Sequence, residues 1–579
     1  MAGRGSPHVP LSALALGFVV FASLWLLSVR YRHSYVPRQD DVTVLADGLL
    51  LLPVAKWTDW FTRGDTYFFD VYPEWPWRVT PFSRPVFQLA IYLGHFLLGK
   101  HWESYLALNY GGVAAVAAVA FGIARTALGL SRAASVLSAV LVLLSPAVLA
   151  SSLTDLSLAS EPLASALVGC GFLAVLARRD WLCAALLMIA LLTKETAAWA
   201  PFAAALTVLL RPEREGGPRR LLAAVLVLAP FVFWLGLRLA FYGGISGGYA
   251  TAYWPLAGFL RLTLWKLTHL DHLFVMQEIP ATDGRWAPAN LVFRIGMAVL
   301  VFLLLIPWAL TGLRSAIDRV IARDKRWPAA DGALLVTLWA GMGLGFHFAL
   351  ALSNPSYASA AVMFAWPAVV AEAAWRGPML RLGLAACSVL SLAQMSHFLG
   401  VSTHLWGQGP TASIFDGVRA MNAALNQIPT EIKQVYVLSA GGLVPANPDY
   451  LRALLEGNAE IIRVADVEWN CSDAAEHVVF DHDSIGGVVT LDAAVPKCGR
   501  FFFAVPQIGA SALVDGQIRR NAWFSYELPE ARLKERAKPT DLSLEPGRRL
   551  IAHVRTRGPA RFIIERGRAD GGIAWFDTP

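Results

Sequence analysis

Charged residues are scarce in this chain of 579 residues. Asp, Glu, Lys and Arg make up 16% of it and hydrophobic residues 56%, whereas soluble domains average about 25% charged and about 45–50% apolar residues. Runs without charge recur throughout residues 11–400, as in chains that cross a membrane several times. The composition excludes a single soluble domain and predicts an α-helical polytopic membrane protein.

Signatures of nucleotide and nucleic-acid binding are also missing. Residues 403–579 contain no G-x-G-x-x-G sequence, no P-loop and no internal repeat. The net charge of +7 comes mostly from short loops between apolar runs, where it is a signal of membrane topology. We therefore expect no nucleic-acid partner.

Cysteine is rare, with five residues in the chain. Cys170, Cys183 and Cys387 fall in apolar runs, whereas Cys471 and Cys498 follow the last run and could pair if that side of the membrane is oxidising. The first apolar run, 11–27, has no small-x-small cleavage site before Arg30 and is predicted to remain as an uncleaved anchor.

Eleven apolar runs predict eleven transmembrane spans. They lie near 11–28, 104–124, 133–150, 157–177, 181–193, 196–210, 221–241, 291–312, 332–352, 357–375 and 382–400. A twelfth run, Pro85–Leu98, has only 14 residues, and a helix needs about 20 to cross. We interpret this run as a segment that does not cross.

The basic residues support this count, because short cytoplasmic loops are rich in Lys and Arg. With a cytoplasmic N-terminus, the cytoplasmic loops contain Arg125, Arg132, Arg178, Arg179, Arg211, Arg214, Arg219, Arg220, Arg314, Arg319, Arg323, Lys325, Arg326, Arg376 and Arg381. The outer loops after residue 150 contain Lys194, Arg261, Lys266 and Arg285. A true span at Pro85–Leu98 would invert every later loop.

This topology predicts two domains. Residues 1–402 form the transmembrane domain, including a first extracytoplasmic loop at 29–103 that is rich in aromatic residues around 57–77. Residues 403–579 form an extracytoplasmic α/β domain, in which strands are predicted at 434–439, 460–465, 500–505, 549–554 and 561–565 and a helix at 448–456. Ala- and Arg-rich usage suggests a bacterium, and we expect the chain in its inner (plasma) membrane.

Acidic residues on the outer face are candidates for catalysis. Asp40 and Asp41 follow the first span by about ten residues, where one could act as a general base toward an acceptor hydroxyl. The alternative is a solvated loop pair or a helix cap. Glu161, just inside its span and before Pro162, could line a cavity or stabilise a kinked helix.

Basic residues near the same face are candidates for binding phosphate. Arg238 lies about one turn inside its span, where ionisable groups usually face a cavity, although it could also extend to the interface. Lys194 could bind phosphate or form a local ion pair with Glu195. His269 and His272, together with Asp271, could bind a divalent metal ion or belong to an ordinary amphipathic helix.

Four short patterns resemble those of the GT-C membrane glycosyltransferases, which include the protein O-mannosyltransferases and the lipid A aminoarabinose transferases. The patterns are Arg38-Gln39-Asp40-Asp41, Ser83-Arg84-Pro85, Leu153-Thr154-Asp155 and Thr193-Lys194-Glu195. They occur in the family's order within residues 10–400. The topology derived from charge also agrees with that of the family.

The resemblance implies inverting transfer of a sugar from a polyprenyl-phosphate-linked donor to an extracytoplasmic acceptor, which could be a glycan, a lipid or a protein. Asp40 would be the catalytic base, and Asp41 stands where the family usually has Glu. Arg84 and Lys194 would contact the donor phosphate. Asp155 would help to bind the acceptor or a metal ion.

Two other functions fit parts of the pattern. A transporter of lipid-linked sugars would also need basic groups in a cavity, but such proteins often contain paired repeats, and none is found here. An O-antigen ligase or polymerase would use a diphosphate-linked donor and hold a catalytic Arg and His in an outer loop, and residues 242–290 contain both.

Overall fold

The computed structural model describes two units of the chain. In the first it describes residues 11–27, 84–98, 102–148, 159–211, 217–242, 330–349, 355–379 and 381–386; in the second it describes short strands between 434 and 577, and a few isolated residues are described besides. The predicted helix 448–456, Cys387, Cys471 and Cys498 lie outside these residues, and so do the predicted span 291–312 apart from Leu310 and most of the span 382–400.

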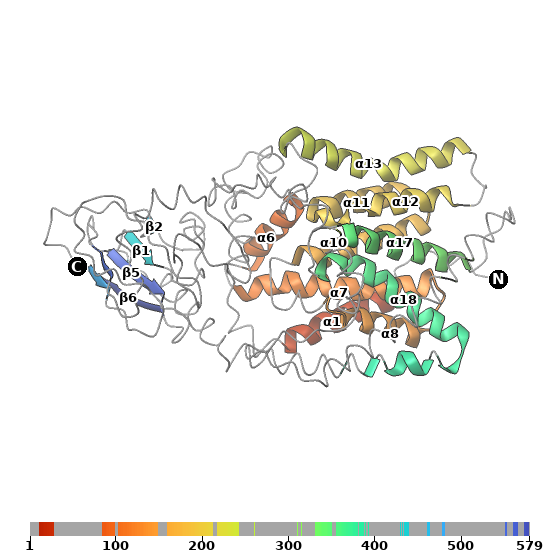
Figure 1. Cartoon of the computed structure of the whole chain (residues 1–579), viewed down its shortest axis with the longest axis horizontal. Helices are drawn as coiled ribbons and strands as arrows, with labels where there is room; N and C mark the ends of the chain where they lie inside the picture. The colour runs from red at the N-terminus through yellow and green to blue at the C-terminus, as the bar shows by residue number, and fades with distance from the viewer. Residues whose placement is uncertain are drawn as a thin grey trace. The chain divides into compact units, whose positions relative to one another are not determined.

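The first unit is a bundle of helices that run alongside one another (Figure 1). Its long helices are α1 (Leu11–Leu27), α7 (Trp102–Thr126), α8 (Arg132–Leu143), α10 (Ser160–Leu176), α11 (Asp180–Thr193), α12 (Ala200–Leu209), α13 (Gly217–Tyr242), α17 (Ala330–Ala349) and α18 (Ser359–Arg376). Helix α6 (Pro85–Leu98) packs against α7 and α11.

Four stretches of these helices are long and apolar enough to cross a membrane. They are Leu106–Thr126, Pro218–Phe241, Gly332–Ala349 and Ser356–Trp375, and α1, α6, α8, α10, α11 and α12 are shorter apolar helices. Helix α6 has the predicted 14 residues, about 21 Å in length, which is less than the about 30 Å of a bilayer core. The total of eleven spans stays a prediction.

Two predicted spans begin or end differently from expectation, each beside a proline. Helix α8 ends at Leu143 rather than near 150, because Pro146 follows and disfavours a helical conformation at Ser145. Helix α12 begins at Ala200 rather than 196, with Pro201 in its first turn, where a proline needs no hydrogen-bond partner. A short 3-10 helix, η2 (Glu195–Ala197), precedes it.

Close packing of small residues fixes the direction of α7 relative to α10. A Cβ placed on Gly112 would touch Pro162 and Leu163, and one placed on Gly122 would touch Leu173. The contacts advance along both helices in the same direction, so α7 and α10 are parallel. Small residues allow helix backbones to approach closely, as is usual in membrane bundles.

Similar contacts orient three more helices. Helix α18 is parallel to α10, since Ser359 contacts Ser165 and Met363 lies beside Gly169. Helix α11 is antiparallel to α10, since its N-terminal residue Asp180 binds Arg211 near the C-terminus of α10. Helix α1 is antiparallel to α7, since Gly17 lies beside Ala118 whereas Trp25 packs edge-on against Tyr110.

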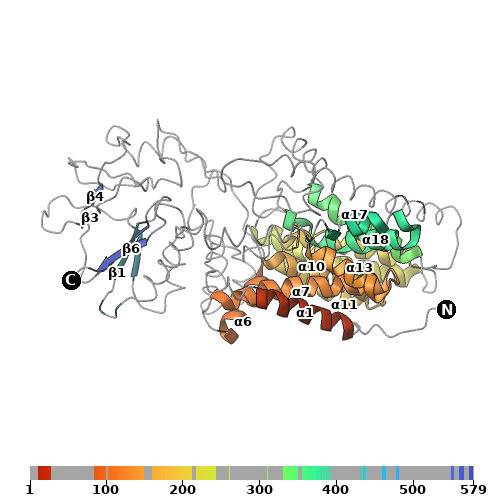
Figure 2. The same ribbon diagram turned by 90° about the horizontal axis from the view of Figure 1, so that it is seen from below.

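The bundle therefore has two chemically different ends. One, which we call the basic end, contains the C-termini of α7, α10, α12 and α18 and most of the described arginines: Arg125, Arg132, Arg178, Arg179, Arg211, Arg219, Arg220, Arg376 and Arg381. The other, which we call the acidic–basic end, contains the N-termini of α10 and α18, the C-termini of α1 and α11, and η2. Figure 2 shows α1 and α7 alongside each other in the bundle.

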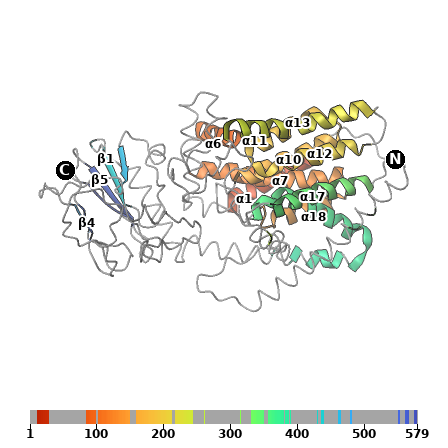
Figure 3. The ribbon, with the colours of Figure 1, turned by 45° about the horizontal axis from the view of Figure 1, so that its top comes forward.

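An aromatic cluster fills the centre of the bundle. Phe172, Trp339 and Phe364 pack edge-on or tilted, with ring centroids 5.1–5.4 Å apart, and Trp199 adjoins them. One buried indole in this cluster is hydrogen-bonded: Trp339 Nε1 donates to Thr207 Oγ1 at 2.9 Å. These contacts join α10, α12, α17 and α18, which Figure 3 shows side by side.

Substituting alanine for Gly169 is expected to destabilise the bundle. A Cβ there would overlap the stiff side chain of Val119 and lie 2.7 Å from Met363 Cε. Overpacking of this kind costs about 1–3 kcal/mol, so the apparent melting temperature of the detergent-solubilised protein should fall. Gly236→Ala is the matched control because nothing lies within 4 Å of its added Cβ. Equal melting temperatures for the two variants would contradict this packing.

The second unit contains two small sheets. The larger has the order β2-β1-β5-β6, with β1 (Gln434–Leu438) parallel to β2 (Glu460–Arg463) and to β5 (Ala560–Glu565), and β6 (Ile573–Asp577) antiparallel to β5. In the smaller, β3 (Val478–Phe480) pairs antiparallel with β4 (Leu550–Ala552). Four of the five predicted strands are confirmed; β3 and β6 were not predicted, and 500–505 lies outside the described residues.

Candidate functional site

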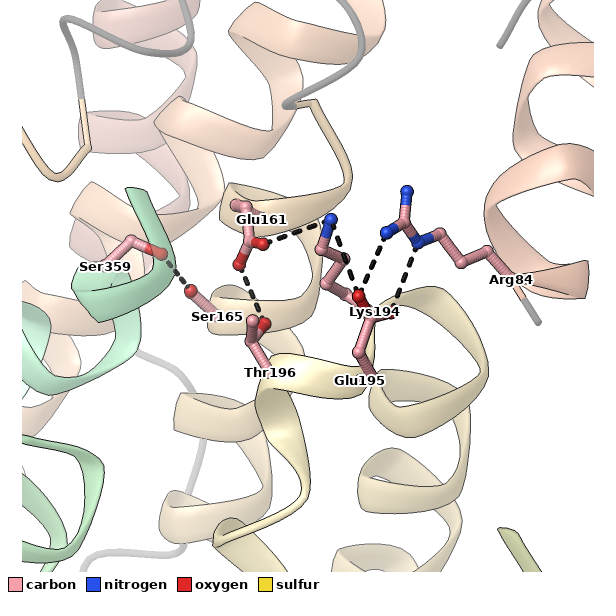
Figure 4. A network of polar contacts seen from close by, with 7 residues as sticks. All are labelled: Arg84, Glu161, Ser165, Lys194, Glu195, Thr196 and Ser359. Atoms are coloured by element: carbon pink, nitrogen blue, oxygen red, sulfur yellow. Dashed lines mark hydrogen bonds and ion pairs between the residues drawn. The ribbon is translucent and has the colours of Figure 1, made fainter. Parts of the chain in front are cut away.

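Four ionisable side chains meet at the acidic–basic end of the bundle (Figure 4). Arg84 stands immediately before α6, Glu161 lies in the first turn of α10, and Lys194 and Glu195 form the connection between α11 and α12. We call Arg84, Glu161, Lys194 and Glu195 the four-charge cluster. It joins three segments that are widely separated in sequence.

A break between two helices positions half of this cluster. Lys194 is extended, with φ −159° and ψ 132°, so the helix of α11 stops before it. The chain then turns through η2, where the amides of Ala197 and Ala198 donate to the carbonyls of Lys194 and Glu195. Because the backbone reverses here, the two neighbouring side chains face different partners.

Arg84 and Glu195 form a two-point ion pair. Arg84 Nη2 donates to Glu195 Oε1 at 2.9 Å, and Arg84 Nε donates to Oε2 at 3.2 Å. A planar guanidinium and a planar carboxylate match in this arrangement, which is stronger than a single hydrogen bond. The pair fixes the start of α6 against the α11–α12 connection.

Lys194 lies between two carboxylates and a ring. Its Nζ is 3.3 Å from Glu161 Oε1 and 3.9 Å from Glu195 Oε1, and it lies 5.4 Å from the ring centroid of Tyr357. The other oxygen of Glu161 accepts a hydrogen bond from Thr196 Oγ1 at 2.8 Å. The structure thus confirms a charge partner for Lys194, but the nearer one is Glu161 rather than its sequence neighbour.

The cluster is electrically balanced but unevenly buried. Two cations alternate with two carboxylates, so their formal charges cancel. The side chains of Lys194 and Glu161 are 3% and 2% exposed, whereas those of Arg84 and Glu195 are 12% and 22% exposed. Unpaired charges at such depth would be very unfavourable, so the inner pair depends on mutual neutralisation and the outer pair adjoins the surface.

Glu161 and Pro162 do not mark a kink. Helix α10 begins at Ser160, so Pro162 lies in the first turn, where an amide has no intrahelical acceptor to lose. Of the two alternatives for Glu161, the stabilisation of a kinked helix is therefore wrong. Its carboxylate instead binds Lys194 and Thr196.

Of the sequence-predicted site residues, the structure brings together Arg84, Lys194 and Glu161. Arg238 lies in α13, is 1% exposed, and has its guanidinium carbon 5.4 Å from the Trp234 ring centroid. The others lie outside the described residues: Asp40, Asp41, Asp155, His269 and His272. Among the described residues no group of three His, Cys, Asp or Glu side chains could hold a metal ion.

The roles of three residues in and around the cluster were not predicted from the sequence. Glu195 was visible as the neighbour of Lys194, but its partner Arg84 lies 111 residues away along the chain, and such a pairing leaves no local signal. Thr196 and Tyr357 belong to no pattern that distinguishes them from the other polar residues at helix ends. Their positions follow from the fold alone.

Chemically, the cluster contains two cationic groups that could bind an anion, Arg84 beside the surface and Lys194 behind it. An Arg guanidinium can bind a phosphate through two parallel hydrogen bonds, and a Lys ammonium can add a point charge. Glu195 occupies the edge of the Arg84 guanidinium formed by Nε and Nη2. An anion that used this same edge would have to replace the Glu195 carboxylate.

Comparisons with known proteins give a limited result. No protein-family model matches the chain, and no curated protein matches it. Among solved structures, the chain is similar to the crystal structure of ArnT from Cupriavidus metallidurans in the apo state, with 15% identity, coverage of 79% of this chain and 86% of that chain, and a TM-score of 0.46. Nothing about the chemistry of this chain follows from a likeness at this level.

Proposed function

We propose that the protein is a membrane glycosyltransferase that transfers a sugar from a polyprenyl-phosphate-linked donor to an acceptor on the extracytoplasmic face, with inversion. The observation that carries the proposal is the four-charge cluster, which places Arg84 and Lys194 together at one end of a bundle of apolar helices. Basic groups at the end of a membrane bundle suit a ligand that combines an isoprenoid chain with a phosphate.

The charge asymmetry of the bundle supports the proposed side of the membrane. Most described arginines lie at the basic end, and the positive-inside rule assigns that end to the cytoplasm. The four-charge cluster then faces outward. The chain leaves α1 at the same outer end, and Asp40 follows Leu27 by thirteen residues in the sequence.

In the proposed mechanism, the cations and the acids have separate tasks. Arg84, Lys194 and Arg238 stabilise the negative charge that the donor phosphate gains as the sugar departs, which is often the largest catalytic contribution. Asp40 removes the proton of the acceptor hydroxyl, with Asp41 beside it. Asp155, five residues before the start of α10, and His269 and His272 would contact the acceptor or a divalent metal ion.

The test is the binding of a defined lipid to the full-length protein in detergent. Geranylgeranyl phosphate should bind to the wild type, and geranylgeraniol, which lacks the phosphate, should not. An Arg84→Gln variant should bind the phosphate about 10- to 100-fold more weakly, because the net contribution of a hydrogen bond to a charged group is about 1.5–3 kcal/mol. Arg132→Gln, an exposed arginine at the basic end, is the matched control.

Two further ligands distinguish the proposed donor from lipids that share only part of its chemistry. Dioleoyl phosphatidic acid carries a phosphate on an ordinary lipid, and geranylgeranyl diphosphate represents the donors of ligases and polymerases. Preference for either of them over geranylgeranyl phosphate would contradict the proposal. So would equal binding of geranylgeranyl phosphate by Arg84→Gln and Arg132→Gln.

A further inference from the structure

Resting on the proposed function, we propose that Glu195 is an internal anion that occupies the phosphate position between Arg84 and Lys194 and must be displaced when the lipid phosphate binds. Glu195 is then a positioning residue that determines how tightly the site holds an anion. The proposal names a role for a carboxylate beside the two bases, rather than for the bases themselves.

The geometry of Glu195 is that of a bound ligand. Its two oxygens accept from Arg84 Nη2 and Nε at 2.9 and 3.2 Å, and Oε1 also lies 3.9 Å from Lys194 Nζ. One carboxylate thus bridges both cations. Two oxygens of a phosphate would fit the same guanidinium fork, because carboxylate and phosphate bind it in the same two-point manner.

The difference in burial indicates which carboxylate an anion can displace, Glu195 rather than Glu161. Glu161 is 2% exposed and is held by Lys194 and Thr196, so it has two buried partners and almost no exposed surface by which to leave. Glu195 is 22% exposed, the most of the four charged side chains. An anion arriving from the surface would therefore meet Glu195 first.

The backbone gives Glu195 a means of moving. It belongs to the short 3-10 helix η2, a segment of three residues between an extended Lys194 and the start of α12. Rotation of this side chain away from Arg84 requires no change in the spanning helices. Glu161 stays beside Lys194 when Glu195 leaves. The positive charges of Arg84 and Lys194 are then balanced by Glu161 and by the phosphate, which takes the place of Glu195.

This exchange lowers the apparent affinity for an anion. A ligand that binds only the state with Glu195 displaced has an affinity reduced by the fraction of molecules in that state. The Glu195→Gln variant, which keeps the shape but removes the charge, should therefore bind geranylgeranyl phosphate about tenfold more tightly than the wild type. Glu195→Asp keeps the charge on a side chain one methylene shorter, so its affinity for geranylgeranyl phosphate should lie between those of the wild type and Glu195→Gln.

The experiment measures geranylgeranyl phosphate binding to the detergent-solubilised full chain for the wild type, Glu195→Gln, Glu195→Asp, Glu161→Gln and Arg84→Gln. Each variant is first checked for a monodisperse elution profile and a cooperative melting transition. The expected order of affinity is Glu195→Gln, then Glu195→Asp, then the wild type, then Arg84→Gln. Glu161→Gln should not bind more tightly than the wild type. If Glu195→Gln does not fold, Glu195→Asp alone decides, because it must still exceed the wild type.

Three different results would each overturn either the inference about Glu195 or the proposed function. Weaker binding by Glu195→Gln together with weaker binding by Arg84→Gln would mean that Glu195 only braces Arg84, which ends the inference but not the proposed function. Equal tightening by Glu195→Gln and Glu161→Gln would mean that net charge alone acts, which also ends the inference. Unchanged binding by Arg84→Gln would end the proposed function itself.

Discussion

An Asp40→Asn variant is expected to lose sugar transfer by about 10²- to 10⁴-fold, the contribution of a positioned general base. Asparagine has nearly the same shape as aspartate but cannot accept the acceptor's proton. Turnover can be followed as release of labelled polyprenyl phosphate from a polyprenyl-phosphate sugar in membranes that contain the protein, which does not require the acceptor to be identified.

Two controls show whether the loss is chemical. Binding of geranylgeranyl phosphate should be the same in Asp40→Asn as in the wild type, because the phosphate contacts Arg84 and Lys194 in the proposed site. Asp47→Asn makes the same change seven residues further along the chain and should leave turnover unchanged. Wild-type turnover in Asp40→Asn would remove Asp40 as the base.

The side of the membrane provides a separate check on the same residue. A single cysteine at position 40 in an otherwise cysteine-free chain should react with a membrane-impermeant maleimide added outside intact cells or spheroplasts. Labelling only after the membrane is opened would place residue 40 in the cytoplasm. The proposed site would then be divided between two faces, and the mechanism would fail.

Apolar runs predicted the helices well because the energy of burying apolar surface in a bilayer acts on every residue of a span. Nine predicted runs correspond to described helices, namely α1, α7, α8, α10, α11, α12, α13, α17 and α18, and the 14-residue run at Pro85–Leu98 is a helix of the same length. The first and last residues of a helix were predicted less well where a nearby proline determines them. Pro146 ends α8 early and Pro201 delays α12, and both effects are local and were readable from the sequence.

The charged site was only partly predictable. Arg84 matched a family pattern, whereas Glu161 and Lys194 also stood out because ionisable residues near span ends are costly and rarely accidental. Which carboxylate pairs with which base depends on how α6, α10 and the α11–α12 connection pack, and no local pattern encodes that. Glu195 looked like the partner of its neighbour Lys194, and the two do lie 3.9 Å apart, but both oxygens of Glu195 accept hydrogen bonds from Arg84.

A Lys194→Met variant is expected to lower the free energy of unfolding by about 3–5 kcal/mol, which is typical when one partner of a buried ion pair is removed. Methionine fills a similar volume, but Glu161, at 2% exposure and with Thr196 as its remaining hydrogen-bond partner, would have to stay charged beside no cation or take up a proton, and both cost free energy. The loss should appear as a lower apparent melting temperature at a fixed scan rate. Arg132→Gln, which changes an exposed cation, should stay within about 0.5 kcal/mol of the wild type.

The double variant Lys194→Met/Glu161→Gln separates charge burial from packing. Removing the second charge leaves no unpaired ion, so the double variant should recover part of the lost stability and melt above Lys194→Met alone. Additive losses would show that each side chain acts through packing rather than through the pair. Recovery of stability without recovery of geranylgeranyl phosphate binding is the combination expected if Lys194 both neutralises Glu161 and contacts the donor phosphate.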